Sequence, residues 1–291
     1  MKVLLFGTSG NPPTGRDGHS GIVDYFVNLE QFDELWVLPV YKHMFADKRD
    51  TMGEPGAPTF EDRVEMCRLS FEMCSTASCK VKVLETEKEV FSEMVTAHTT
   101  IPPRTSSYDV IRYLQKRHPE AQARATCDTL STDTFEGTFS FLVGTDTYQD
   151  LRSGKWRCSE ELMKIVPFVV VDRLGVRRDN FLEGVELHHP PMLTNVSSTK
   201  IRNAGARELV LDSLTLEPSV LEYMRERRLY GFGRQSWLER TVDAASERVT
   251  KRWLIVAGAA GLLVAVGVGT AAFGNGWRIG GARCGKTRCT R

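Results

Sequence analysis

The stretch "GTSGNPPTGRDGHSGIV", residues 7–23, follows the apolar run "KVLLF" at the start of the chain. Glycines in such a turn let backbone N–H groups approach a phosphate, and a helix that begins near Gly18 directs its positive end to the same place. His19, at the start of this helix, could donate a hydrogen bond to a phosphoryl oxygen. The alternative is that the glycines and prolines only build a tight turn and that His19 caps the helix.

A second stretch, "NVSSTKIRNAG", residues 195–205, has the residue types of a polyphosphate site. Ser198 and Thr199 are typical of a helix start, and Lys200 and Arg202 follow within one turn. Hydroxyls, helix N–H groups and a guanidinium together suit phosphate oxygens. A helix cap without any ligand is the alternative, because such caps are common.

Five short apolar runs, which alternate with helix-compatible stretches, must position these residues. They lie at residues 2–6, 34–40, 79–85, 139–144 and 165–171. This alternation predicts an α/β fold, a Rossmann-like, doubly wound and mostly parallel sheet with helices on both faces. Helical spacing is present at 61–73 and 108–118, and a last helix is predicted from Pro218 to near Gly231. Ligands of such sheets bind outside the carboxyl ends of the strands, where residues 7–23 are expected.

The composition of the 291-residue chain excludes several classes of protein. Residues 251–291 hold seven Lys and Arg and no acid, so the other 31 bases and 37 acids give residues 1–250 a net charge of −6. Nucleic acid is therefore not an expected partner. Seven scattered cysteines without a C-x-x-C pair indicate a reducing compartment rather than a zinc site or a disulfide scaffold.

The C-terminal run "WLIVAGAAGLLVAVGVGTAAF", residues 253–273, has 21 uncharged residues between basic flanks. That length spans a hydrocarbon core as a helix, so the run is predicted to be a transmembrane helix and a tail anchor. A buried helix rich in Ala and Gly is the alternative. Residues 233–252 then form a charged linker, and residues 274–291 form a short basic tail.

The two phosphate-type stretches together resemble the signatures of the nucleotidylyltransferase superfamily, G-x-F-[DN]-P-x-[HT]-x-G-H and I-S-S-T-x-[IV]-R. "FLVGTDTYQDLRSGKW", "EDRVEMCRLSF" and "LEPSVLEYMRERRLYGF" resemble segments of the nicotinamide- or nicotinate-mononucleotide adenylyltransferases. The resemblance covers residues 1–232, which are expected to be the catalytic domain. It implies adenylyl transfer from ATP to a pyridine mononucleotide, with Mg²⁺ bridging substrate oxygens and no metal-ligating side chain.

The resemblance also implies roles for individual residues. Catalytic roles fall to His19 and Arg202. ATP and its phosphates are assigned to Gly7, Thr8, Ser9, Thr14, Gly18, Lys48, Gly144, Asp146, Ser198 and Thr199. The mononucleotide is assigned to Trp156, Ser107 and Lys42, although spacing does not select between Lys42 and Lys48 as the phosphate contact.

The chain departs from the superfamily pattern at one place. The pattern has one residue between its Thr or His and the Gly-His pair, whereas Gly15, Arg16 and Asp17 separate Thr14 from Gly18. The sequence leaves open whether Thr14 still faces the phosphates and whether Arg16 contacts them or is neutralised by Asp17.

Other functions stay open at this stage. A different member of the superfamily would make a coenzyme A precursor or a CDP-alcohol, and a tethered relative that binds nucleotide without turnover would be no enzyme. The expected location is a membrane with the catalytic domain facing the cytosol, and the basic tail resembles tail anchors of the mitochondrial outer membrane. A homo-oligomer is one open alternative for the assembly state.

Overall fold

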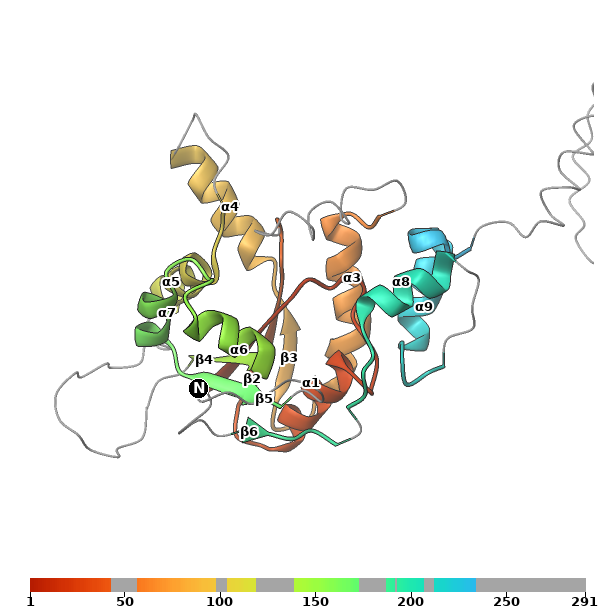
Figure 1. The fold of residues 1–291 in the computed structure, drawn as a ribbon, viewed down its shortest axis with the longest axis horizontal. Coiled ribbons are helices and arrows are strands. Elements are labelled where there is room, and N and C mark those ends of the chain that lie inside the picture. Colours follow the sequence, from red (N-terminus) through yellow and green to blue (C-terminus); the bar gives the residue numbers. More distant parts are fainter. Residues whose placement is uncertain are drawn as a thin grey trace, which may run out of the picture. The chain divides into compact units, whose positions relative to one another are not determined.

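Six parallel strands form the centre of the computed structural model, which describes residues 1–42, 57–97, 104–118, 139–172, 187–191, 193–206 and 212–233 (Figure 1). All these residues belong to one unit that extends from Met1 to Arg234. Among them, no helix combines the length and the apolar character needed to cross a membrane. The predicted span at 253–273 and the basic tail lie outside the described residues.

The strand order is β3-β2-β1-β4-β5-β6, and every pair is parallel. The strands are β1 (Val3–Thr8), β2 (Glu34–Pro39), β3 (Lys80–Val83), β4 (Phe139–Gly144), β5 (Phe168–Val171) and β6 (Leu187–His188). Each of the five predicted apolar runs overlaps one of the first five strands, which confirms the expected Rossmann-like sheet. The sixth strand was not predicted, because two residues at a sheet edge carry no periodic signal.

Both faces of the sheet are buried, and the strands alternate between two cores. Along β1, Leu4 and Phe6 pack in one cluster while Val3 and Leu5 pack in the other. This two-sided burial explains why the strands are near-continuous apolar runs in the sequence.

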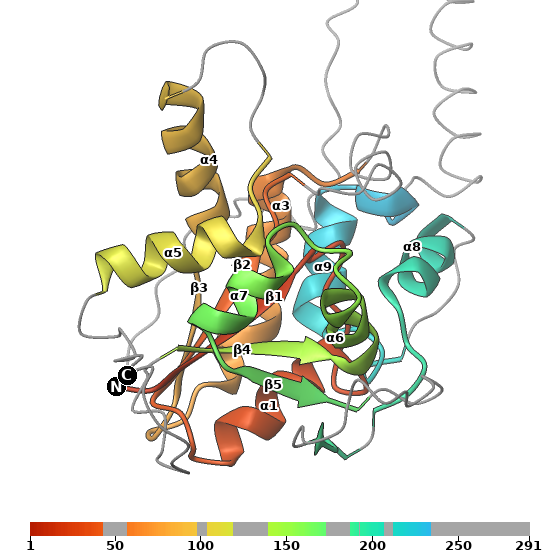
Figure 2. The same cartoon turned by 60° about the vertical axis from the view of Figure 1, so that its left-hand side comes forward.

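Helices cover each face of the sheet (Figure 2). Those of the first face are α1 (His19–Asn28) and α3 (Phe60–Phe71), and those of the second are α4 (Thr86–Ala97), α5 (Ser107–Arg117), α6 (Thr145–Arg152) and α7 (Ser159–Ile165). Two further helices, α8 (Ser198–Ala206) and α9 (Pro218–Glu226), pack through a third apolar cluster that includes Met66 of α3. The short 3₁₀ segments are η1 (Glu72–Cys74) and η4 (Leu229–Gly231).

The predicted helices at 61–73 and 108–118 correspond to α3 and α5. The last helix is shorter than expected: α9 ends at Glu226, and Arg228 and Tyr230 have φ angles of 55° and 52°. A left-handed residue cannot continue a right-handed helix, so the chain turns there into η4. These bends direct the final described segment back toward the loop that follows β1, as the contacts of Tyr230 show below.

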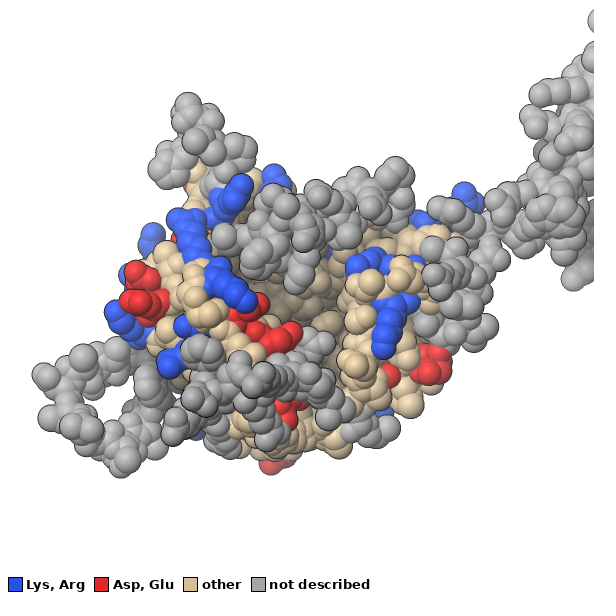
Figure 3. Space-filling model, in the orientation of Figure 1, with Lys and Arg blue, Asp and Glu red and all other residues tan. Residues whose placement is uncertain are grey.

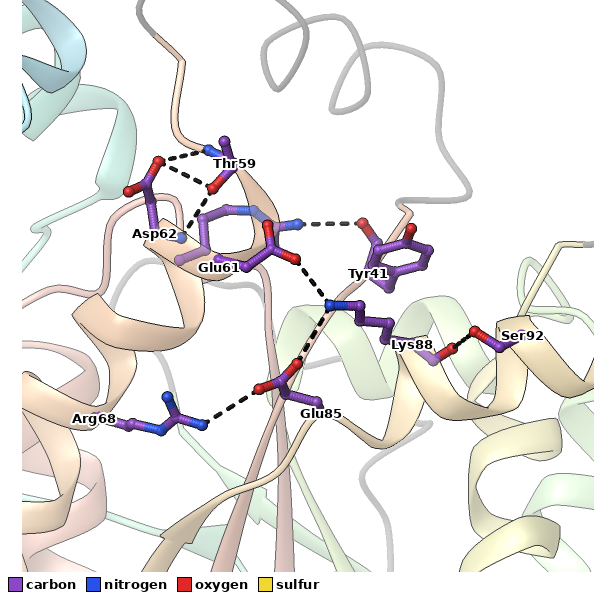
Figure 4. Close-up of polar contacts among 9 residues, drawn as sticks. Tyr41, Thr59, Glu61, Asp62, Arg68, Glu85, Lys88 and Ser92 are labelled. Carbon is purple, nitrogen blue, oxygen red and sulfur yellow. Dashed lines mark hydrogen bonds and ion pairs between the residues drawn. The ribbon is translucent and has the colours of Figure 1, made fainter.

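Ion pairs join α3 to the start of α4, which cover opposite faces of the sheet (Figure 4). Lys88 lies 2.8 Å from Glu61 and 3.6 Å from Glu85, and Glu85 also pairs with Arg68 at 3.3 Å. These side chains are partly exposed, so the pairs contribute little to the stability of the fold.

Candidate active site

The sheet reverses its strand order between β1 and β4, and the carboxyl ends of these two strands are the expected ligand position. Gly7 is exposed there, although its strand neighbours Phe6 and Thr8 are 8% and 6% exposed. The residues that follow the two strands therefore border an open position above the middle of the sheet. Figure 3 shows Lys and Arg side chains over the α5 and α7 side and over α8, with Asp and Glu side chains and uncharged surface between them.

His19 begins α1 and is bonded to Thr14 in three ways. The Thr14 N–H donates to Nδ1 of His19 at 3.1 Å, the two side chains meet at 2.9 Å, and the His19 N–H donates to the Thr14 hydroxyl at 2.7 Å. Thr14 is only 2% exposed. The structure thus places Thr14 behind the imidazole, as a support for it.

These bonds select the tautomer of His19. A backbone N–H can only donate, so Nδ1 is the acceptor, and in the neutral ring the proton is on Nε2. With its proton on Nε2, the ring can donate a hydrogen bond to a phosphoryl oxygen. Gly18 is part of the same arrangement, because a Cβ at this position would lie 2.2 Å from the Thr14 hydroxyl oxygen.

The segment Gly15–Asp17, which departs from the superfamily pattern, is hydrogen-bonded to the start of α1 and to Thr194, which precedes α8. The Gly15 carbonyl accepts the N–H groups of Gly18 and Ser20 at 2.9 and 3.1 Å. The Asp17 carboxylate accepts the Thr194 hydroxyl at 3.0 Å. Arg16 is exposed. Burial raises the pKa of the Glu217 carboxyl and the positive charge of Arg16 opposes this effect, so that charge acts on the α9 side.

The start of α8 is bonded directly to the loop that follows β1. The Ser198 hydroxyl donates to the Pro12 carbonyl at 2.7 Å, and Arg202 donates to the Asn11 carbonyl at 2.6 Å. Arg202 also donates to the Thr199 hydroxyl at 3.0 Å. The two phosphate-type stretches, about 180 residues apart in the chain, therefore form one continuous wall with His19 and Arg202 in it.

Three supporting residues were not predicted as part of the site, and two of them, Tyr230 and Asn11, are bonded to each other. The Tyr230 hydroxyl donates to Oδ1 of Asn11 at 2.6 Å, so one asparagine holds both Tyr230 and, through its carbonyl, Arg202. Asn11 is 3% exposed. In the sequence, Tyr230 belongs to the "LYGF" part of the segment that resembles the family, but no local pattern indicates its hydrogen bond to Asn11.

The third supporting residue is Arg63 of α3, which is 2% exposed. It donates to the carbonyls of Ser9 and Val40 at 2.7 and 2.6 Å and to that of Tyr41 at 3.2 Å, so it ties the loops after β1 and β2 together. Burial lowers the pKa of Arg63, and nearby Glu87 opposes this effect. The Tyr41 N–H donates to Glu87 at 2.8 Å, and burial raises the pKa of that carboxyl to about 7.

Two of the residues assigned to ATP have structural bonds of their own, and the position of a third, Gly144, follows from the elements around it. The Thr8 hydroxyl accepts the Gly10 N–H at 3.2 Å, the Ser9 carbonyl accepts Arg63, and Gly144 ends β4 and precedes α6. Asp146 lies in the first turn of α6, across the switch point from His19.

Of the residues assigned to the mononucleotide, Trp156 lies in the turn between α6 and α7, and Ser107 lies at the start of α5. Trp156 is half-buried, with its ring centroid 6.5 Å from that of Phe141 on β4. Ser107 is the first residue of α5. Arg157, next to Trp156, donates to the Arg104 carbonyl at 2.9 Å, so the segments of Trp156 and Ser107 are neighbours.

Of the two lysines that are candidates for a phosphate contact, the structure describes only Lys42. Lys42 lies over the Phe91 ring, with Nζ 4.2 Å from its centroid, so it packs against α4. Lys48 lies outside the described residues. The described part of the chain also holds no group of three or more His, Cys, Asp or Glu side chains that could bind a metal.

Comparison with known proteins agrees with the resemblance in the sequence. No family model matches the chain. A protein of Myxococcus xanthus named "probable nicotinate-nucleotide adenylyltransferase" is 28% identical over 234 residues, which cover 80% of this chain and 97% of that protein. A protein of the same name from Exiguobacterium sibiricum is 29% identical over 233 residues, covering 79% of this chain and 99% of that protein.

A solved structure supports the fold. The Plasmodium falciparum nicotinic acid mononucleotide adenylyltransferase, complexed with NaAD, matches with a TM-score of 0.55 and 20% identity over 79% of this chain and 98% of its own. The described domain is therefore similar in sequence to curated nicotinate-nucleotide adenylyltransferases and has the fold of such an enzyme, as the sequence motifs predicted.

Proposed function

We propose that this chain is a nucleotidyltransferase that moves the adenylyl group of ATP to a pyridine mononucleotide, nicotinate or nicotinamide mononucleotide, in NAD biosynthesis. The observation that carries the proposal is the single wall in which His19 and Arg202 are bonded to one loop, within a domain similar to nicotinate-nucleotide adenylyltransferases. Because the similar proteins are named nicotinate-nucleotide adenylyltransferases, nicotinate mononucleotide is the first substrate to test.

In this reaction a phosphate oxygen of the mononucleotide attacks the α-phosphorus of ATP. A new P–O bond forms, the bond from the α-phosphorus to the bridging oxygen of the β-phosphate breaks, and pyrophosphate leaves with that electron pair. The protein needs no nucleophile, so its contribution is orientation of the two phosphates and stabilisation of developing negative charge.

The described residues suit these two tasks. His19 donates from Nε2 to a phosphoryl oxygen, since its Nδ1 accepts the Thr14 N–H. Arg202 holds the leaving phosphates together with the hydroxyls and helix N–H groups of Ser198 and Thr199. Loss of one such donor is expected to lower kcat by about 10² to 10³.

The pyridine end is proposed to lie against Trp156 and the start of α5 at Ser107. An aromatic ring offers a stacking face to the pyridine, and a helix start offers N–H groups to its carboxylate or amide. Asp146 is proposed to face the nucleotide from the start of α6.

Mg²⁺ is proposed to act as a substrate-borne ion. The hydroxyls, guanidinium and helix start of the wall fit phosphate oxygens, and these oxygens, with water, are the ligands that Mg²⁺ prefers. When bound, the ion supplies neutralisation of phosphate charge.

A membrane location is a further part of the proposal. The support is the uncharged run at residues 253–273, which would anchor the chain with its catalytic domain in the cytosol, at the mitochondrial outer membrane or another membrane. The basic residues on both sides of the run do not select an orientation by themselves.

The test is pyrophosphate release by the full chain in mild detergent with ATP and Mg²⁺. Nicotinate and nicotinamide mononucleotide are compared with a phosphopantetheine and a CTP-plus-alcohol-phosphate control, each with wild type and His19→Ala. Release that requires a pyridine mononucleotide and falls about 10²-fold or more in the variant supports the function. Release only with another acceptor, or ATP binding without any turnover, contradicts it.

A further inference from the structure

We propose that Asp17, within the segment that departs from the superfamily pattern, is a positioning residue that fixes the two phosphate-binding stretches relative to each other. The inference rests on the proposed function, because it assigns a role in the same site. Asp17 reaches the polypeptide that leads into α8, not a substrate. It therefore acts through the residues of the wall.

Asp17 is bonded twice to Thr194, four residues before Ser198. The Thr194 hydroxyl donates to Oδ2 of Asp17 at 3.0 Å, and the Thr194 N–H donates to the Asp17 carbonyl at 2.9 Å. These bonds hold the chain immediately before the "VSSTKIR" stretch, and they come from the segment in which three residues stand where the superfamily pattern has one.

The same segment is held from its other side. The Gly15 N–H donates to the Thr215 carbonyl at 2.8 Å, and the Asp17 N–H donates to the Leu214 carbonyl at 3.2 Å. A side chain at Gly15 would not fit, since its Cβ would lie 2.3 Å from the Leu214 carbonyl oxygen. Asp17 is thus a fixed support between the residues that precede α9 and those that precede α8.

Two attachments restrict α8 more than one attachment does. Ser198 and Arg202 bond to the loop at Pro12 and Asn11, on the side of the turn before Thr14. Thr194 bonds to Asp17, on the side after Thr14. With both in place the start of α8 cannot rotate about a single contact, so the phosphate donors of α8 stay in register with His19.

Stability alone does not explain why a carboxylate stands at position 17, because burial of this group is unfavourable. It is 9% exposed, and its Oδ1 is buried without a hydrogen-bond partner among the described residues. Burial of such a polar atom lowers the free energy of unfolding. Removal of the carboxylate is therefore expected to leave the unfolding midpoint unchanged or raised while catalysis falls, which a purely structural role does not predict.

The experiment tests the side-chain hydrogen bond between Asp17 and Thr194 in the full chain, which is kept in mild detergent. The variants are Asp17→Ala, Thr194→Val, their combination and Thr194→Ser, which keeps the hydroxyl. Asp24→Ala, an exposed acid on α1, is the matched control. The measurements are kcat, the KM for ATP and the thermal unfolding midpoint.

We expect Asp17→Ala and Thr194→Val each to lower kcat/KM for ATP about tenfold, and the double variant to lose no more than either single one, because both remove the same bond. Thr194→Ser and the control should match wild type. The unfolding midpoints of Asp17→Ala and of the double variant should not fall. Thr194→Val alone should lower its midpoint, because it leaves the buried Asp17 carboxylate without its hydroxyl donor.

Full activity of both single variants, additive losses in the double variant, or a loss of activity in Asp17→Ala that tracks a fall in its unfolding midpoint would overturn the proposal. If wild type makes no product from any pyridine mononucleotide, the proposed function fails separately. The positioning role is then decided by the Kd for ATP, which Thr194→Val should raise and Thr194→Ser should not; equal values in the two variants would overturn it.

Discussion

The Thr14 N–H donates to Nδ1 of His19 at 3.1 Å, and the His19 N–H donates to the Thr14 hydroxyl at 2.7 Å. The imidazole is thus held in the tautomer with its proton on Nε2, by a threonine that is 2% exposed. The role of Thr14 is to orient the residue that donates to phosphate.

Thr14→Val removes the hydroxyl but retains the shape of the side chain and its backbone N–H. We expect kcat to fall about tenfold, since misplacement of a donor by a fraction of an ångström weakens transition-state stabilisation. Thr14→Ser, which keeps the hydroxyl, should retain most of the activity. Steady-state kinetics on the three proteins check this, and equal activity of the Val and Ser variants would contradict it.

Tyr230→Phe removes the hydroxyl that donates to Oδ1 of Asn11 at 2.6 Å. Because Asn11 is buried, the abandoned acceptor should lower the free energy of unfolding by about 1–3 kcal/mol. The KM for ATP should also rise, since the Asn11 carbonyl holds Arg202. Denaturant unfolding and kinetics measure the two effects. Tyr25→Phe, on a ring that packs against Phe26, is the control, and an equal response of both variants would refute the role of Tyr230.

Glu87 makes stability depend on pH near neutrality. Burial raises its pKa to about 7 from the ordinary 4.5, against the opposing effects of the Tyr41 N–H and Arg63. A raised carboxyl pKa means that the folded protein binds the proton more tightly than the unfolded chain. Stability is therefore lost as the pH rises from about 4.5 through 7 and then levels off.

Glu87→Gln does not titrate and keeps an acceptor for the Tyr41 N–H. Between pH 5 and pH 8, wild type should lose about 2 kcal/mol of unfolding free energy relative to this variant, a value reduced for the partial exposure of the side chain. Denaturant unfolding at the two pH values measures the difference. Parallel curves for wild type and variant would show that Glu87 does not have the raised pKa.

A chain that ends at residue 252 lacks the proposed membrane anchor. We expect the full chain to remain in the membrane fraction after an alkaline carbonate wash and the shortened chain to be soluble. Fractionation of expressing cells measures this, with activity of both chains as the control for folding. Recovery of the full chain in the soluble fraction would contradict the anchor.

The parallel sheet and the two chemical stretches follow from local sequence. Buried strands of a parallel sheet are apolar on both faces, so they are visible as runs such as residues 139–144. A glycine-rich turn before a helix and a Ser-Thr helix start are local features whose meaning depends on neighbours in the chain. Local pattern is therefore sufficient to identify His19, Ser198 and Arg202 as candidate phosphate contacts.

The way in which these stretches are joined depends on long-range packing. Thr194 and Asp17 are 177 residues apart, and Tyr230 and Asn11 are 219 apart, so no local pattern could pair them. The position of Lys42 over the Phe91 ring also depends on the packing of α4, so no local pattern could predict it. Local chemistry specifies what a segment offers to a ligand, whereas packing of distant segments specifies which side chains are left to face the ligand and which ones hold the others in place.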